Sequence, residues 1–207
     1  MATDEIRSKG MLTLTTICLG QAFSLLGTAM TGFALAVWAW QVTGQATALA
    51  LVGFFAFAPL VLASPFAGAL VDRWNRKATM ILSDLAAALS TAIVLFLFAT
   101  GSLQIWHLYV SSAFSAVFQA FHFPAYSAAV TTIVSKKQYG RASGMLSLAQ
   151  SASGVFAPMF GVILLSFAGV GGVLMTDLIT CFVAVSIVLL ARIPKPNVTN
   201  AGLKGRG

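Results

Sequence analysis

The chain has 207 residues, of which 58% are hydrophobic and 8% are charged. This composition leaves too little polar surface to cover a water-soluble globule of that length, so it excludes a soluble globular protein. The net charge of +7 does not indicate nucleic-acid binding, because no basic cluster is interleaved with stacking aromatic residues. We therefore expect an integral membrane protein surrounded by membrane lipid.

Several apolar stretches are long enough to cross a bilayer core of roughly 30 Å, which takes about 20 helical residues. In chain order they cover residues 12–40, 46–70, 78–99, 105–130, 142–168 and 171–191. The sequence thus predicts an all-α membrane protein with six transmembrane helices. We expect residues 1–191 to form one transmembrane domain, and residues 192–207 to form a cytoplasmic tail or the beginning of an inter-domain linker.

The lysines and arginines are confined to alternate connections between these stretches. All 12 lie before the first stretch, in the second and fourth connections, or after the last stretch. The connections near 41–47, 100–107 and 168–172 contain none. The positive-inside rule therefore places both termini and the charged connections in the cytoplasm. The expected location is a bacterial inner membrane, crossed several times.

The second connection carries the most informative motif, Gly68-Ala-Leu-Val-Asp72-Arg73-Trp-Asn75-Arg76-Lys77. Charged side chains are costly in hydrocarbon, so this segment belongs in a short loop at the water interface. It resembles the loop between helices 2 and 3 of major facilitator superfamily transporters, G-x-L-x-D-R-x-G-R-K. Asn75 replaces the inner glycine, and we expect it to adopt the left-handed backbone that asparagine tolerates.

The resemblance implies one half of a major facilitator fold. Such transporters have twelve helices in two domains, with the binding site between the domains. In that family the aspartate that matches Asp72 meets a helix of the second domain and closes the cytoplasmic side. Asp72 and the charged residues around it are therefore expected to form a cytoplasmic gate.

A faint internal repeat agrees with this fold. Phe57-Ala58-Pro59 is echoed by Phe156-Ala157-Pro158, and Ser83-Asp84-Leu85 by Thr176-Asp177-Leu178. The first three helices therefore resemble the last three. An odd number of crossings per copy makes the two copies enter the membrane from opposite sides, so we predict an inverted 3+3 repeat.

Two of the stretches carry polar residues at helical spacing, on one face of each helix. They are Gln21, Ser24, Thr28 and Thr31 in the first stretch, and Ser111, Ser115, Gln119, His122 and Tyr126 in the fourth. Helices 1 and 4 line the central cavity in the resembled family, so we expect these residues, Ser111 excepted, to line a substrate cavity. The alternative is that they hydrogen-bond neighbouring helices. For the small hydroxyl residues, cavity lining and hydrogen bonding between helices are equally favoured. For Gln119 and His122, cavity lining is favoured.

His122 is a group within a span that can titrate near neutral pH, so it is a candidate for proton coupling or for substrate contact. The alternative is a neutral histidine satisfied by a nearby carbonyl group. Asp84 and Asp177 lie in the early turns of their predicted helices, where the helix dipole favours an acid. Asp84 can also reach the cations Arg76, Lys77 and Arg141. We favour this structural role for both acids over proton transfer.

The fifth stretch contains Gly154-Val-Phe-Ala157-Pro158-Met-Phe-Gly161, which resembles the G-x-x-x-G-P-x-x-G-G signature of drug:proton antiporters. Ala157 and Val162 replace two glycines of that signature, so the match is partial, and close packing of small residues explains the segment equally well. The arginine in helix 4 of that branch is absent here, which weakens the case for proton antiport. The chain as a whole still resembles macrolide-exporter-like and siderophore-exporter-like facilitators.

The sequence therefore predicts the N-terminal half of a secondary active exporter of amphiphilic small molecules, either drug-like or siderophore-like. It would work by alternating access once paired with a second six-helix half, which is either a C-terminal domain or another copy, with protons as the candidate coupling ion. The alternative is a non-transporting membrane scaffold that binds a partner. An enzyme is not expected, because no metal-spaced cluster or nucleophile–base pair is present. We expect no cofactor and no metal.

Overall fold

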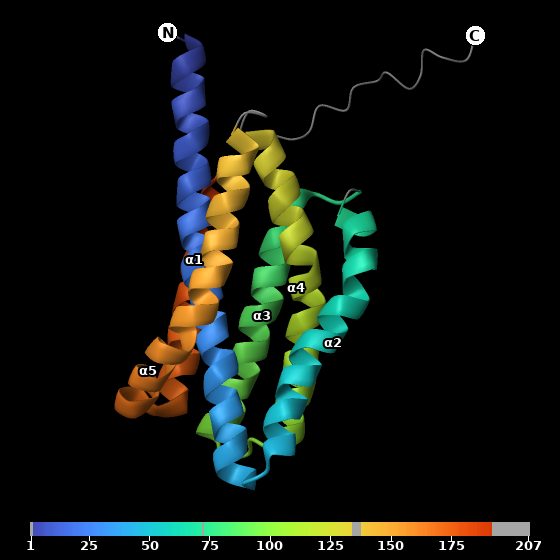
Figure 1. Ribbon diagram of the computed structural model, residues 1–207, viewed down its shortest axis with the longest axis vertical. Coiled ribbons are helices and arrows are strands. Elements are labelled where there is room, and N and C mark those ends of the chain that lie inside the picture. The colour runs from blue at the N-terminus through green and yellow to red at the C-terminus, as the bar shows by residue number, and fades with distance from the viewer. Residues whose placement is uncertain (1, 72, 134–137, 192–207) are drawn as a thin grey trace, which may run out of the picture.

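The computed structural model describes residues 2–71, 73–133 and 138–191, with side chains described from residue 14 onward except those of 132 and 133. This part of the chain forms long helices joined by short connections, arranged as one bundle (Figure 1). The helices are α1 (Ala2–Thr43), α2 (Ala46–Val71), α3 (Arg76–Ala99), α4 (Ile105–Ile133) and α5 (Tyr139–Leu190). The prediction of an all-α protein is confirmed.

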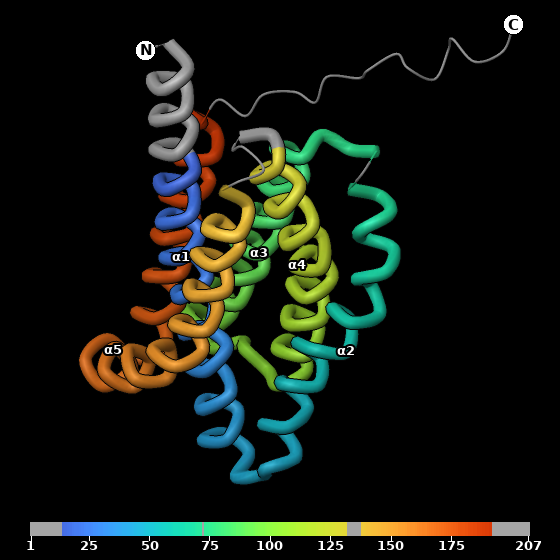
Figure 2. The backbone as a smooth tube through the Cα atoms, turned by 45° about the horizontal axis from the view of Figure 1, so that its top comes forward, coloured from blue at the N-terminus to red at the C-terminus, as the bar shows by residue number. Residues whose placement is uncertain are grey.

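Helix α5 consists of two helical segments on either side of Gly169. The φ of 64° and ψ of −172° at Gly169 interrupt the helix, and this backbone region is essentially restricted to glycine. The chain reverses direction there, so residues 139–168 and 170–190 run in opposite directions (Figures 1 and 2). We call these the first and second segments of α5. The reversal falls between the two stretches predicted at 142–168 and 171–191.

The described part of helix α4 lacks a continuous stretch apolar enough to be recognised as a membrane span. Among the described residues, α2, α3, α5 and residues 14–43 of α1 are long and apolar enough to cross a membrane, and α4 is not among them. The sequence predicted a span at 105–130. The difference arises because the serine, glutamine and histidine side chains of the α4 stripe lower the hydropathy of the helix.

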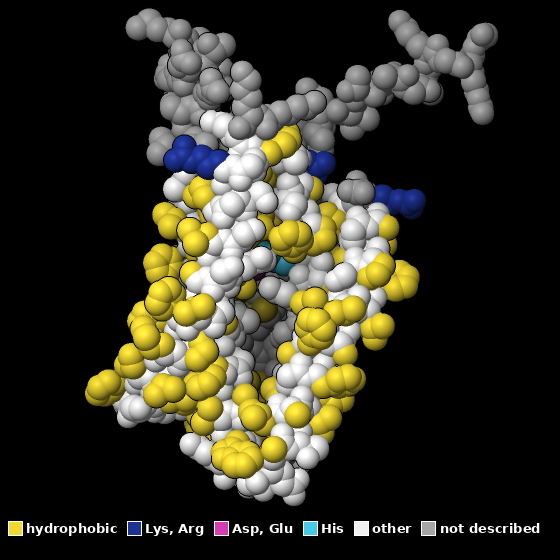
Figure 3. Space-filling model, in the orientation of Figure 1, with side chains coloured by type: hydrophobic (Ala, Val, Ile, Leu, Met, Phe, Trp, Pro, Cys, Tyr) yellow, Lys and Arg dark blue, Asp and Glu magenta, His cyan; other side chains and the backbone are white. Residues whose placement is uncertain are grey.

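The three cation-free connections all turn at a glycine with a left-handed backbone. Gly44, Gly101 and Gly169 have φ values of 63°, 69° and 64°. Such a backbone allows a tight reversal that a side chain would disfavour. These turns lie together at one end of the bundle (Figure 1), and the described lysine and arginine side chains lie at the opposite end (Figure 3).

The outer surface of the bundle is apolar. Large hydrophobic side chains point outward from α2 and from both segments of α5, including Phe57, Leu62, Phe167, Phe182 and Leu190. Phe167, for example, is 87% exposed. Figure 3 shows such side chains over most of the visible face. A surface of this kind suits a lipid environment.

Buried side chains form three apolar clusters, two of which lie on either side of a set of polar residues. One of these two includes Leu14, Ile17, Met80, Tyr126 and Val188. The other includes Leu35, Val52, Val94, Leu108 and Leu174. Along α1, α3 and the second segment of α5, most of the buried polar residues fall between these two clusters, and they include both Asp84 and Asp177. The polar middle of the bundle is therefore flanked by apolar packing on either side.

Helix α1 packs closely against the second segment of α5 because glycines face that segment. A Cβ atom added to Gly27 would collide with the hydroxyl of Thr180 and come within 3.2 Å of the Asp177 Cα. A Cβ atom on Gly20 would lie 2.7 Å from Cδ1 of Ile187. Small residues that permit such close approach are typical of helix interfaces in membranes.

Candidate functional site

Two adjoining cavities open in the polar middle of the bundle. The smaller, about 50 Å³, lies between α1, α4 and the first segment of α5. The larger, about 250 Å³, lies between α1, α2, α3 and α4. Both are lined by Leu25, Thr28 and Gln119, so the two cavities meet at these side chains. Figure 3 shows the bundle hollowed on the face between α5 and α2.

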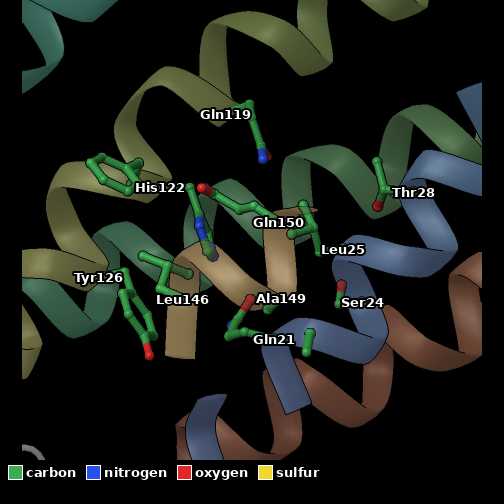
Figure 4. A pocket seen from close by; sticks show the side chains of 12 residues that line it. Gln21, Ser24, Leu25, Thr28, Gln119, His122, Tyr126, Leu146, Ala149 and Gln150 are labelled. Atoms are coloured by element: carbon green, nitrogen blue, oxygen red, sulfur yellow. The ribbon is translucent and has the colours of Figure 1, made fainter. Parts of the chain in front are cut away.

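Every residue predicted to line a substrate cavity lies at one of these two cavities. The smaller is lined by Gln21, Ser24, Thr28, Gln119, His122 and Tyr126. The larger is lined by Thr28, Thr31, Ser115 and Gln119. The fold thus brings the two polar stripes of α1 and α4 together, as Figure 4 shows for the smaller cavity. Their contact with a substrate stays a prediction.

Several cavity residues were not predicted from the sequence, among them three polar ones on α3 and α5. Gln150, on the first segment of α5, lines the smaller cavity and points into the same space as His122 (Figure 4). Ser90 and Thr91 of α3 line the larger cavity. A signal for Gln150 was present, since it is an isolated amide in a largely apolar stretch. Thr91 follows Asp84 by seven residues, which places both on one helix face.

Asp84 on α3 is contacted by side chains from two other helices. The Gln21 amide of α1 donates a hydrogen bond from Nε2 to Asp84 Oδ2, with a distance of 2.9 Å. Nε2 of His122 on α4 lies 3.2 Å from Oδ1 of the same carboxylate. Within the described residues this Nε2 has no partner of hydrogen-bond geometry. The imidazole therefore lies beside the carboxylate, and no hydrogen bond of good geometry joins the two groups.

Asp177 on the second segment of α5 is held by hydroxyl groups. Thr28 Oγ1 of α1 donates to Oδ1 at 3.0 Å, and Thr91 Oγ1 of α3 donates to Oδ2 at 2.9 Å. The hydrogen bonds thus tie three helices together at one carboxylate. Neither Asp84 nor Asp177 belongs to a group of three or more possible metal ligands among the described residues.

The two acids lie deeper in their helices than a helix-dipole role requires. Helix α3 begins at Arg76 and has no acidic residue in its first turn, so Asp84 lies beyond the reach of the helix-dipole effect. Asp177 lies two turns past Gly169. Both carboxylates instead accept hydrogen bonds from side chains of neighbouring helices.

The predicted pairing of Asp84 with Arg76 or Lys77 is also not found. Arg76 Nη1 donates to the carbonyl oxygen of Ala128 on α4, at 2.7 Å. Lys77 Nζ donates to the carbonyl oxygens of Leu189 and Ala191, at 2.7 and 2.8 Å. Leu189 and Ala191 lie at the C-terminal end of α5, where carbonyl groups lack intrahelical partners, so Lys77 satisfies them. Arg141, also proposed as a partner of Asp84, is exposed.

Asn75 does not adopt the predicted left-handed backbone. Its φ of −71° and ψ of 110° are those of an extended residue, and it is the N-cap of α3. Its side-chain oxygen accepts hydrogen bonds from the backbone N–H groups of Lys77 and Ala78, at 3.1 and 3.3 Å. Asparagine suits this position because its side chain can satisfy the free N–H groups that begin a helix.

The remaining residues of the charged motif lie at the same end of the bundle. Gly68 is half-buried near the end of α2, and Arg73 is exposed. Asp72, the residue predicted to act as a gate, lies outside the described residues.

The motif of the first segment of α5 divides between two environments. Gly161 is buried, and a Cβ atom added to it would lie 2.9 Å from Cδ1 of Phe33 on α1. Gly154 and Pro158 are exposed, and a Cβ atom on Gly154 would meet nothing within 4 Å. Gly161 therefore serves helix packing, while Gly154 is left free on the outer face of the segment.

Comparison with known proteins identifies the family of this chain. The sequence profile of the Major Facilitator Superfamily matches residues 17–206. Macrolide efflux protein A of Streptococcus pyogenes is 29% identical over 180 residues, which are 87% of this chain and 44% of that protein. Multidrug resistance protein 2 of Bacillus subtilis is 36% identical over 117 residues, which are 56% of this chain and 28% of that protein.

A solved structure shares the fold. The chain superposes with a TM-score of 0.69 on a bacterial homologue of the human lysosomal transporter Spinster, crystallised in an inward-facing and unoccupied conformation. The sequences are 18% identical, and the match covers 90% of this chain and 44% of that one. The chain thus spans about half the length of the relatives it matches. On the sequence profile, which covers most of its length, the chain belongs to the Major Facilitator Superfamily.

Proposed function

We propose that this chain forms the N-terminal half of a secondary active exporter of amphiphilic small molecules. The observation that carries the proposal is the polar cavity enclosed by an apolar bundle. A purely structural bundle has no need of a lined cavity, since buried polar groups are costly in a membrane. Membership of the transporter family and the relatives named for macrolide efflux and multidrug resistance support export.

The lining of the larger cavity favours an amphiphilic substrate. Hydroxyl groups of Thr28, Thr31 and Ser115 face the same space as the apolar side chains of Leu35 and Val94. A ligand with both apolar surface and a few hydrogen-bonding groups matches such a lining. Drug-like and siderophore-like molecules both meet this description.

Transport would require a second half. A cavity of about 250 Å³ that is open on one face encloses little of a drug-sized molecule. A second six-helix half, either a C-terminal domain or another copy of this chain, would close that face and permit alternating access. In this proposal α1 to α4 and the two segments of α5 each cross the membrane, as two inverted sets of three. The end that carries the described cations would be cytoplasmic.

Reconstitution tests the proposal. The chain is placed in proteoliposomes alone and together with a candidate second half, and flux of radiolabelled erythromycin and of ethidium is measured under a proton gradient. We expect flux with both halves and none with the chain alone. Absence of flux with both halves, when each half is folded, would favour the non-transporting scaffold.

Cavity variants sharpen the test. Gln119→Ala should change the apparent affinity or the rate of flux while expression and thermal stability stay near wild type. Val117→Ala, an outward-facing position on the same helix, is the matched control and should leave flux unchanged. Loss of folded protein in Gln119→Ala, without a specific effect on flux, would return this residue to a packing role.

A further inference from the structure

Asp84 and His122 form an acid–base pair at the wall of the smaller cavity. The two residues come from different helices, and His122 Nε2 lies 3.2 Å from Asp84 Oδ1. His122 lines the cavity, whereas Asp84 is buried behind it. An imidazole can exchange a proton near neutral pH, and a carboxylate beside it can accept a hydrogen bond from the protonated ring. The pair therefore combines a titratable group, a partner of opposite charge and a route to the cavity.

The other groups around the pair do not neutralise the carboxylate. From α5, the Cys181 thiol donates to the backbone oxygen of Asp84 and not to its side chain. From α4, the hydroxyl of Tyr126 lies near Cys18 of α1. From α1, Gln21 supplies a neutral donor.

The basic side chains that the structure describes lie elsewhere. Among the described residues, the only salt-bridge contact of Asp84 is with His122. Arg76 donates to a carbonyl group of α4, and Lys77 donates to carbonyl groups at the C-terminal end of α5. His122 is therefore the described group that can balance the charge of Asp84.

We propose that Asp84 and His122 bind one exchangeable proton between them and form the ion-coupling site of this chain. The proton enters from the cavity and is held at His122 Nε2 beside Asp84 Oδ1. With the proton bound the pair is neutral overall, and without it one negative charge is buried, which is costly in a membrane. Gln21 is a positioning residue, because its hydrogen bond to Oδ2 links α1 to the charge of the pair. The coupling role rests on the proposed function, whereas proton binding does not.

Asp177 provides the contrast within the same chain. It is as deeply buried as Asp84, but its described side-chain partners are hydroxyl groups of threonine, which do not titrate. Asp177→Asn is therefore the matched control for Asp84→Asn.

The test uses the full chain in lipid nanodiscs, labelled with ¹³C at the imidazole of histidine. The chain has two histidines, so His107, at the start of α4, is an internal reference, and His122→Gln assigns the signals. In wild type we expect the His122 resonance to titrate. In Asp84→Asn its midpoint should differ from that of wild type, because the carboxylate 3.2 Å from His122 Nε2 is then absent. The His107 midpoint should not show this change in Asp84→Asn. Asp177→Asn should not produce this change in the His122 midpoint.

An His122 midpoint that is the same in wild type and Asp84→Asn would overturn the proposal. If Asp84→Asn does not fold, wild-type protein with labelled aspartate carboxyl carbons decides the matter. The Asp84 carboxyl signal must then change over the same pH range as His122, and independent titrations would refute a shared proton. These readouts do not depend on flux, so a coupled pair in a chain that fails to transport would refute the proposed function alone.

Discussion

The hydroxyl of Thr28 on α1 lies 3.0 Å from Oδ1 of Asp177 on α5, across 149 positions of the sequence. Two turns earlier on the same face of α1, Gln21 binds Asp84 of α3. One helix therefore contacts both buried acids of the bundle. The polar stripe on α1 serves two purposes, since it lines the cavities and also links α1 to α3 and α5.

Removal of the Thr28 hydroxyl should destabilise the bundle. Thr28→Val keeps the shape of the side chain but leaves a buried carboxylate oxygen without its donor, so we expect a loss of about 1 kcal/mol in the free energy of unfolding. Denaturation in detergent micelles measures it. The control is Ser166→Ala, whose exposed hydroxyl binds only a carbonyl of its own helix. Equal stability of Thr28→Val and wild type would show that the hydrogen bond contributes nothing.

Gly27 should not tolerate a larger residue. A methyl group at this position collides with Thr180 and presses on the backbone at Asp177, so Gly27→Ala should cost about 1–3 kcal/mol, as overpacking does. Gly32 on the same helix has nothing within 4 Å of an added Cβ. Gly32→Ala should therefore be neutral or slightly stabilising. Thermal unfolding of the two variants side by side tests this, and similar melting temperatures would contradict the close packing.

The two readings of Asn75 predict opposite results. As an N-cap, Asn75→Ala should lose about 1 kcal/mol of stability, Asn75→Asp should be tolerated, and Asn75→Gly should cost only a few tenths of a kcal/mol. A left-handed residue would instead be stabilised by substitution with glycine. Chemical denaturation of the three variants distinguishes the two. A clear gain in stability for Asn75→Gly would contradict the N-cap role and support a left-handed backbone at this position.

The orientation can be tested with single cysteines in a background that lacks Cys18 and Cys181. Exposed positions next to the turn glycines avoid strain at the left-handed residues, so Gln45, Ser102 and Ala168 are the sites for one end of the bundle. Gly140, exposed at the other end, is the matched control. An impermeant thiol reagent added to intact cells should label the first three and spare Gly140→Cys. Labelling in the reverse pattern would invert the topology.

Much of the architecture could be predicted from the sequence because it depends on local properties. Apolar length and the alternation of cations do not require knowledge of neighbours, and the polar stripes follow from helical spacing alone. The eight predicted cavity residues accordingly line the two cavities. The reversal at Gly169 was equally local, since it needed only a glycine between two apolar stretches.

The partners of the buried charges could be decided only by the tertiary structure. Asp84 and His122 are 38 positions apart on helices α3 and α4, and helical spacing cannot state which faces of two helices meet. Arg76 and Lys77 lie near Asp84 in the chain, yet their side chains bind carbonyl groups of α4 and α5 instead. Composition and periodicity determined that this protein is a helical membrane bundle with polar stripes. Packing decided which of those polar groups touch, because contact depends on how helices distant in sequence are rotated and placed beside one another.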